Sequence, residues 1–192
     1  MKIIRILFLG ILTGLLFPVF ACSQSRWHPY MGVHASMDAA GNYVGPSFQA
    51  GADYHYKKYV SFTGYLHYFG KSLTEHYDFG EFASGKYRSA IAAIMLQPHL
   101  SRKMNKGFFL AVGLAFQKQG EIYKDNMDTT YTKLNFITGA MRFGYLLATG
   151  KKTLSMEINA SGPHSRSYEI YGYPVSETQF LTQLSLGLRL IF

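Results

Sequence analysis

Three side chains near the end of the sequence have the types found together in serine hydrolases: His164, Ser165 and Glu169. A hydroxyl becomes a nucleophile when a base accepts its proton and an acid orients that base. A second loop holds residue types suited to acyl transfer, at His76, Asp78 and Ser84. Polar loops also collect such residues by chance, so both sets remain weak candidates, and the prediction for this chain is no catalytic residue.

Metal and cofactor chemistry has little support in the sequence. His34, His55 and His67 are predicted to face one interior, but a metal ion needs its ligands at a single height. The chain has one cysteine, which excludes a cysteine metal motif, and it has no glycine-rich phosphate loop. We therefore expect no metal and no cofactor.

Charged residues interrupt three otherwise alternating segments. Arg142, Glu157 and Arg189 fall on the polar side of consecutive predicted strands. A charge in a narrow interior must be paired, because burying an isolated ion is very costly. The pattern predicts an Arg142–Glu157–Arg189 cluster in the lumen, with a structural role in closing it.

The last segment shows what kind of strand carries these residues. From Leu184 to the final Phe192, every second residue is apolar, whereas Gln183, Ser185 and Arg189 lie on the other side. Such a strand has a hydrocarbon-like environment on one face and a tight, partly polar one on the other. This favours a membrane β-barrel with lipid outside.

The same alternation recurs along the chain and predicts eight strands. Each is at least about as long as the nine to eleven residues that a tilted strand needs to cross hydrocarbon. The predicted fold class is all-β, an eight-stranded antiparallel up-and-down transmembrane barrel. The strands are expected at Trp27–Met37, Val44–Tyr56, Tyr59–Phe69, Tyr87–Leu100, Phe108–Lys118, Tyr131–Leu147, Thr153–Ser161 and Glu177–Phe192.

The connections alternate in length and in charge. Short turns follow the second, fourth and sixth strands and carry only basic charges, whereas the longer connections, Gly70–Lys86, Gln119–Thr130 and Gly162–Ser176, hold most of the acids. Short periplasmic turns and long outer loops are typical of outer-membrane barrels, and an even strand number places both termini with the short turns.

The sequence specifies the register of the fourth strand only weakly, because apolar residues occupy both of its faces. If Ser89 and Gln97 face inward, Arg88 points outward at the outer rim, where a lipopolysaccharide phosphate would meet it. Tyr and Phe gather at strand ends, as expected for an interfacial girdle.

The N-terminus, residues 1–23, reads as a secretory signal peptide that is removed, leaving residues 24–192 as one barrel domain. Cleavage is expected after Ser23 or after Ala21; lipidation of Cys22 is the minor alternative. The net charge of +8 is not clustered on one helix or stripe, so we do not expect nucleic-acid binding.

The terminal Phe192, the Leu184–Leu190 alternation and the turn–loop rhythm resemble the small eight-stranded outer-membrane barrels of the OmpA/OmpX type, often described as porin-like. The resemblance implies recognition of Phe192 by the barrel-assembly machinery and contact with outer-membrane lipid and lipopolysaccharide. It settles fold better than function.

We expect a monomer with a filled lumen, acting in the envelope through its outer loops, with an unidentified extracellular partner. Two alternatives stay open. One is a lipid A-modifying enzyme, an acyl hydrolase or acyltransferase, although neither candidate set has a spacing that matches those families. The other is a secreted lipocalin-like barrel, whose apolar side would face inward around a ligand.

Overall fold

The computed structural model describes residues 26–38, 41, 43–57, 59–76, 82–99, 106–124, 129–150, 152–170 and 173–192. The predicted signal peptide, its two cleavage sites and Cys22 lie outside these residues. In the described part of the chain, no helix is long and apolar enough to cross a membrane.

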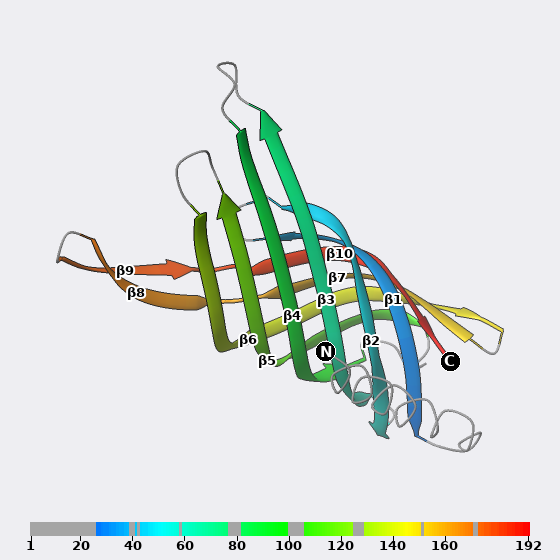
Figure 1. Ribbon diagram of the computed structural model, residues 1–192. Coiled ribbons are helices and arrows are strands. Elements are labelled where there is room, and N and C mark those ends of the chain that lie inside the picture. The colour runs from blue at the N-terminus through cyan, green and yellow to red at the C-terminus, as the bar shows by residue number, and fades with distance from the viewer. Residues whose placement is uncertain are drawn as a thin grey trace, which may run out of the picture.

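Eight antiparallel strands close into a barrel, which confirms the predicted fold class (Figure 1). Around the wall the order is β1-β10-β7-β6-β5-β4-β3-β2, so each barrel strand pairs with the next barrel strand along the chain and β1 closes on β10. The barrel strands are β1 (Trp27–Asp38), β2 (Val44–Lys57), β3 (Val60–His76), β4 (Phe82–Pro98), β5 (Gly107–Lys124), β6 (Thr129–Thr149), β7 (Lys152–Ser161) and β10 (Gln183–Ile191).

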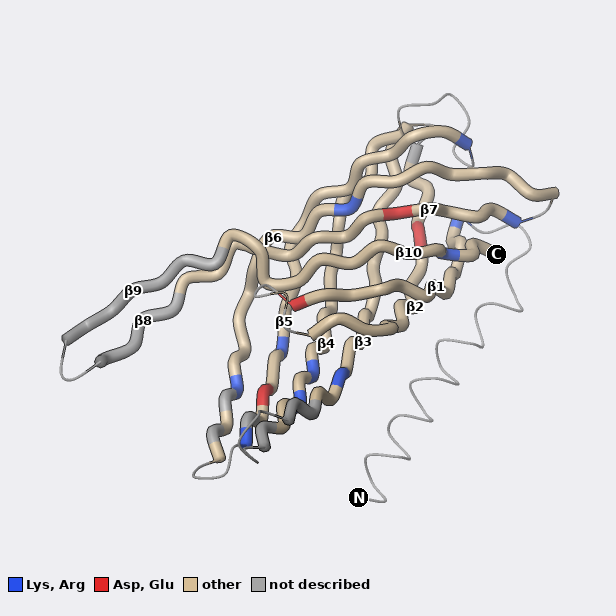
Figure 2. Tube along the Cα trace, turned by 90° about the horizontal axis from the view of Figure 1, so that it is seen from above, with Lys and Arg blue, Asp and Glu red and all other residues tan. Residues whose placement is uncertain are grey.

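Two of the long connections were predicted wrongly as loops. Strands β3, β4 and β5 extend well past the expected Phe69, Tyr87 and Lys118, and β6 begins two residues before the expected Tyr131. Their ladders run on to His76↔Phe82 and Lys124↔Thr129. Glycines and charges in Gly70–Lys86 and Gln119–Thr130 suggested strand breaks, but outside a membrane an antiparallel ladder tolerates polar residues on both faces. The extended strand ends project from the barrel on the side away from the C-terminus (Figures 1 and 2).

The third long connection, Gly162–Ser176, is likewise not a loop. It forms most of a separate hairpin of β8 (His164–Ile170) and β9 (Tyr173–Gln179). The predicted last strand, Glu177–Phe192, is therefore two strands, with Phe180 to Thr182 between β9 and β10. The alternation of Leu184–Leu190 belongs to β10 alone.

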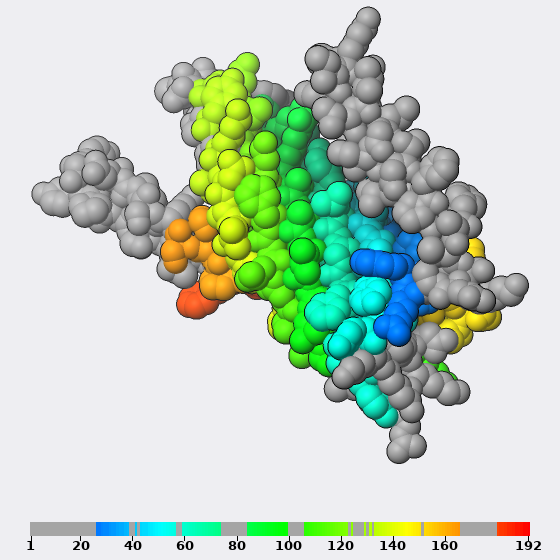
Figure 3. All heavy atoms as spheres, turned by 90° about the horizontal axis from the view of Figure 1, so that it is seen from below, coloured from blue at the N-terminus to red at the C-terminus, as the bar shows by residue number. Residues whose placement is uncertain are grey.

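The two faces of the wall follow the predicted parity. Ile94, Leu114 and Ile137 are 73%, 67% and 72% exposed on the outside, and the space-filling view shows β1 to β6 forming a continuous wall (Figure 3). Ser89 and Gln97 are buried, which fixes the uncertain register of the fourth strand as the inward option. So much exposed apolar surface on a closed wall is stable only against hydrocarbon.

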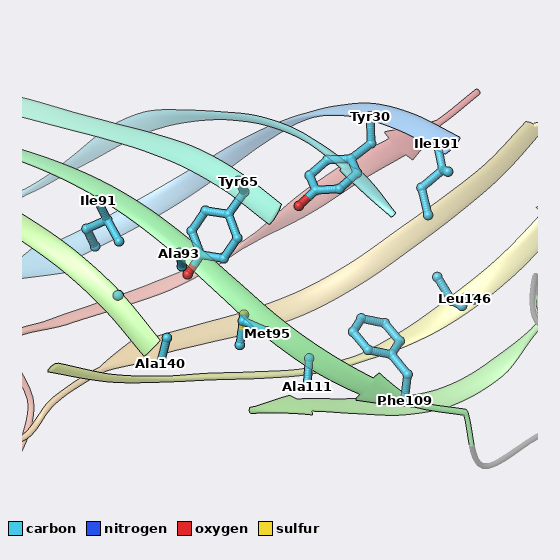
Figure 4. Close-up of a cluster of buried hydrophobic side chains, with 11 residues drawn as sticks. Tyr30, Tyr65, Ile91, Ala93, Met95, Phe109, Ala111, Ala140, Leu146 and Ile191 are labelled. Carbon is cyan, nitrogen blue, oxygen red and sulfur yellow. The ribbon is translucent and has the colours of Figure 1, made fainter. Parts of the chain in front are cut away.

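Inward-facing apolar side chains fill one part of the interior. Tyr30 from β1, Tyr65 from β3 and Phe109 from β5 project into it beside Met95 and small alanines (Figure 4). This packing surrounds the polar groups described next.

Candidate functional site: a charge-balanced lumen

The charged centre of the lumen is built by three neighbouring strands, β6, β7 and β10. Glu157 on β7 lies opposite Gly144 of β6 on one side and Gly187 of β10 on the other. A Cβ atom at Gly144 would meet the Phe109 ring at 2.8 Å, and one at Gly187 would overlap the His34 ring. The two glycines therefore make room for these two rings.

The structure brings Arg142, Glu157 and Arg189 together. Arg189 Nε lies 2.8 Å from Glu157 Oε2, and Arg142 Nε lies 3.6 Å from Oε1 of the same carboxylate. All three side chains are buried, with no measurable side-chain exposure. Both guanidinium groups thus contact one carboxylate in a site shielded from bulk water.

Asp53 on β2 is a fourth member that sequence reasoning did not include. Its Oδ2 lies 3.2 Å from Nη1 of Arg189, and the residue is 2% exposed. With Asp53, two cations face two carboxylates and the formal charge of the cluster is zero. The signal was available in the sequence, because Asp53 is an acid within an alternating segment and a buried acid needs a cation.

Hydrogen bonds satisfy much of the remaining polar surface. Arg142 Nε donates to Asn159 Oδ1 at 2.7 Å, and Ser155 Oγ donates to Glu157 Oε2 at 3.1 Å. When the Gln49 amide is oriented to satisfy both its polar atoms, it donates to Glu157 Oε1 at 3.1 Å and accepts from Arg142 Nη2 at 2.6 Å.

Aromatic rings cover the flat faces of the guanidinium groups. Arg189 lies 4.4 Å from the centroid of Tyr30, and Arg142 lies 4.6 Å from that of Tyr65. Cation–π contacts of this kind strengthen when water is excluded. The cluster is consequently held by charge, hydrogen bonds and stacking together.

Polar side chains form further layers along the lumen. His67 contacts Ser36 at 3.1 Å and Gln183 at 3.3 Å, while Gln117 Oε1 accepts from Thr182 at 2.8 Å and from Ser161 at 3.1 Å. Where these layers lie, side chains fill most of the lumen, as expected for a barrel of eight strands.

The histidines do not assemble as one ligand set. His34 and His67 have ring centroids 5.5 Å apart, whereas His55 lies beside His28, with ring centroids 4.2 Å apart and the rings tilted. His34 Nε2 lies 3.2 Å from Glu157 Oε1 and belongs to the charged cluster. Among the described residues, no group of three or more His, Cys, Asp or Glu side chains is placed to hold a metal ion.

An aromatic cluster packs into the opposite end of the lumen, next to the projecting strands. Tyr43, Phe69 and Tyr87 are buried there, and the Tyr43 and Tyr87 rings stack at 5.2 Å. Tyr43 Oη donates to Glu121 Oε1 at 3.0 Å, and its backbone N donates to Asp38 Oδ1 at 2.7 Å. This end is filled by rings that two acids hold in place.

Two of the weak enzyme candidates, His164 and Ser165, lie at the base of the β8–β9 hairpin, away from the charged cluster. The His164 ring stacks on Phe136 with centroids 3.8 Å apart. Ser165 is the next residue on the same strand, and adjacent strand residues point to opposite faces. The side chains of Glu169 and His76, and all of Asp78, lie outside the described residues, so the structure does not test whether either candidate set comes together.

No family model matches the chain, and no curated protein sequence matches it. Solved structures do match. Ail, the attachment invasion locus protein of Yersinia pestis, was solved with the heparin analogue sucrose octasulfate; it aligns with a TM-score of 0.51 and 9% identity, over 86% of this chain and 97% of Ail.

Two further solved barrels align over similar lengths. Neisserial surface protein A gives a TM-score of 0.44 at 11% identity, over 86% of this chain and 94% of its own. The N-terminal β-barrel domain of Pseudomonas aeruginosa OprF gives 0.43 at 9% identity, over 88% and 98%. At such identities the likeness concerns the fold alone. The closed eight-stranded wall, its apolar exterior and the match to Ail give this chain the fold of the small outer-membrane β-barrels of the OmpA/OmpX type.

Proposed function

We propose that the chain is an integral outer-membrane barrel with a sealed lumen, which acts through the surface of its projecting strands and has no chemistry of its own. The observation that carries this proposal is the contrast between the exposed apolar wall and the buried, charge-balanced interior. A lumen filled in this way favours a structural or surface-contact role over transport.

In the proposed orientation both termini and the short turns face the periplasm, and the ends of β3 to β6 and the β8–β9 hairpin face outward. Basic residues in the short turns support this, because they would meet anionic phospholipid headgroups of the inner leaflet. Phe192 ends the chain at the proposed periplasmic rim, where its backbone N donates to Pro29 O at 2.9 Å. Its half-exposed ring is available there as the proposed assembly signal.

Membrane fractionation with a heat-modifiability gel tests the proposal. The full chain, expressed in a Gram-negative host, should be recovered in the outer membrane and should run faster on SDS gels before boiling than after. Recovery as a soluble periplasmic or secreted protein without this mobility change would favour the lipocalin-like alternative. Conductance of the purified barrel in a planar bilayer should stay at the lipid background.

Lipid A analysis separates the barrel from an enzyme. Mass spectrometry of lipid A from cells that express the chain should show the same acylation as cells with an empty vector. Altered acylation that disappears with His164→Ala or Ser165→Ala would overturn the non-enzymatic part of the proposal.

A further inference from the structure

The outward faces of β4, β5 and β6 carry a cationic patch directly above the apolar wall. It consists of Lys86 and Arg88 on β4, Lys118 on β5 and Lys133 on β6, all exposed. None of the four forms an ion pair with any described residue. Figure 2 shows Lys and Arg gathering along these strand ends.

The strand register places the patch at a defined height. Lys118 lies opposite Ala90 and Asn135, and the next outward pair toward the wall is Phe116↔Ile137. Two residues along a strand span about 7 Å, so the cationic side chains begin within that distance of the apolar wall. On the proposed outer-membrane placement, this is the height of the outer-leaflet headgroups. The patch is not purely cationic, because the exposed Ile122 and Tyr131 lie level with Lys86 on the same face.

A glycine at the centre leaves the patch open. Gly120 on β5 lies opposite Arg88 on one side and Lys133 on the other. An added Cβ there would meet nothing within 4 Å. The two cations therefore stand two strand spacings, or about 10 Å, apart across an empty position, which leaves room for an anion between them.

The described charged side chains around Gly120 on this outward face are all positive. Glu121, the described acid next in sequence to this position, points inward, where it accepts the Tyr43 hydroxyl. Lys124, further along the outward face of β5, is also exposed. An anion bound over Gly120 would thus meet cations without a competing carboxylate on the same face of these strands among the described residues.

We propose that Lys86, Arg88, Lys118 and Lys133 form a binding site for the phosphate groups of a lipid A-type glycolipid, centred on Gly120. Arg88 supplies the planar guanidinium that binds phosphate with two parallel hydrogen bonds, and the lysines supply mobile charge. The acyl chains of the same lipid would lie against the apolar wall below, at Phe116 and Ile137. The inference rests on the proposed outer-membrane placement and gives that placement a specific lipid partner.

A matched pair of variants at one position tests the site. Gly120→Glu places a carboxylate among the four cations without removing any, and Gly120→Gln adds a side chain of the same size without the charge. Lys106→Gln, on the opposite rim, makes the same change in net charge as Gly120→Glu. The mature barrel is folded in phosphatidylcholine nanodiscs, and bound bisphosphorylated lipid A is measured by native mass spectrometry.

Gly120→Glu should reduce the apparent affinity for lipid A by at least about fivefold, the effect of one charge near an anionic surface. Gly120→Gln and Lys106→Gln should change it by less than about twofold. Monophosphorylated lipid A should bind more weakly than the bisphosphorylated form. Inorganic phosphate at millimolar concentration should compete only weakly, because it has no acyl chains.

Unchanged lipid A binding by Gly120→Glu in a heat-modifiable barrel would overturn the site and leave the outer-membrane proposal intact. Equal binding of phosphatidylglycerol would overturn the glycolipid assignment, and full competition by inorganic phosphate would overturn the lipid assignment. If neither the unmodified protein nor any variant forms a heat-modifiable barrel, the result would instead contradict the proposed function.

Discussion

Two groups of basic side chains occupy opposite environments in this barrel. Arg142 and Arg189 lie in the lumen, fully buried, where Glu157 and Asp53 neutralise them. Arg88 and Lys133 stand on the outer face of the projecting strands, exposed and without a described acidic partner. Buried charges must be paired because the desolvation of an ion is costly. Exposed side chains can instead carry an excess of positive charge, which is available to an anionic partner.

Glu157→Gln should produce the largest loss of stability. Removal of this carboxylate leaves Arg142 without its close acid and Arg189 with Asp53 alone. We expect the free energy of unfolding to fall by about 3–5 kcal/mol, as for other broken buried ion pairs. Urea titration in phosphatidylcholine vesicles, followed by the fluorescence of the single tryptophan, Trp27, measures it. A loss below about 1 kcal/mol would mean that the cluster is not needed to hold the lumen.

Leu186→Lys places a cation in a third environment, the apolar outer face of the barrel wall. Leu186 is 61% exposed on β10. If this wall faces hydrocarbon, the change should cost about 2–4 kcal/mol, the range for a lysine near the bilayer midplane. Leu186→Met is the matched control, with an expected cost below about 1.5 kcal/mol. Equal stability of the two variants would argue that water covers this face.

Asp53→Asn should have a smaller effect than Glu157→Gln. Arg189 loses one acid but keeps Glu157 at 2.8 Å, so the expected loss is about 1–3 kcal/mol. The same vesicle titration ranks the two variants. A ranking in which Asp53→Asn is the more harmful would move the centre of the cluster from β7 to β2.

Lys133→Gln should barely change stability. The side chain is exposed and unpaired among the described residues, so we expect a shift within about 0.5 kcal/mol in vesicles that lack anionic lipid. A substantial stabilisation by the substitution would show that repulsion within the patch strains the fold. A substantial loss would reveal a structural partner for this lysine.

The sequence predicted the barrel and most of its faces because period-two alternation is a local property of each strand. It also placed Arg142, Glu157 and Arg189 on one interior, since they fall on consecutive strands. Asp53 was missed as a partner because β1 lies between β2 and β10 in the wall, and a contact between strands that are not paired depends on wall curvature and side-chain reach. The alternation of residues along a single strand does not show which inward-facing side chains of different strands touch.

The lengths of the strands were harder to predict than their faces. Gly120 and Lys124 read as loop residues, yet both lie in β5, because the ladder with β4 and β6 continues outside the apolar wall. Propensity rules treat glycine and lysine as strand breakers, whereas pairing on both sides overrides them here. The cationic patch became visible only once cross-strand register aligned residues from three strands.

The central claim, that the outer wall faces hydrocarbon up to the height of the patch, is tested most directly by nitroxide accessibility at two positions on one face of β6. In a Cys22→Ser background, a spin label at Ile137→Cys and another at Lys133→Cys stand about 13 Å apart along the strand. The label at 137 should relax with oxygen and not with a water-soluble nickel chelate, and the label at 133 should show the reverse. Strong relaxation by the nickel chelate at 137 would contradict the membrane account.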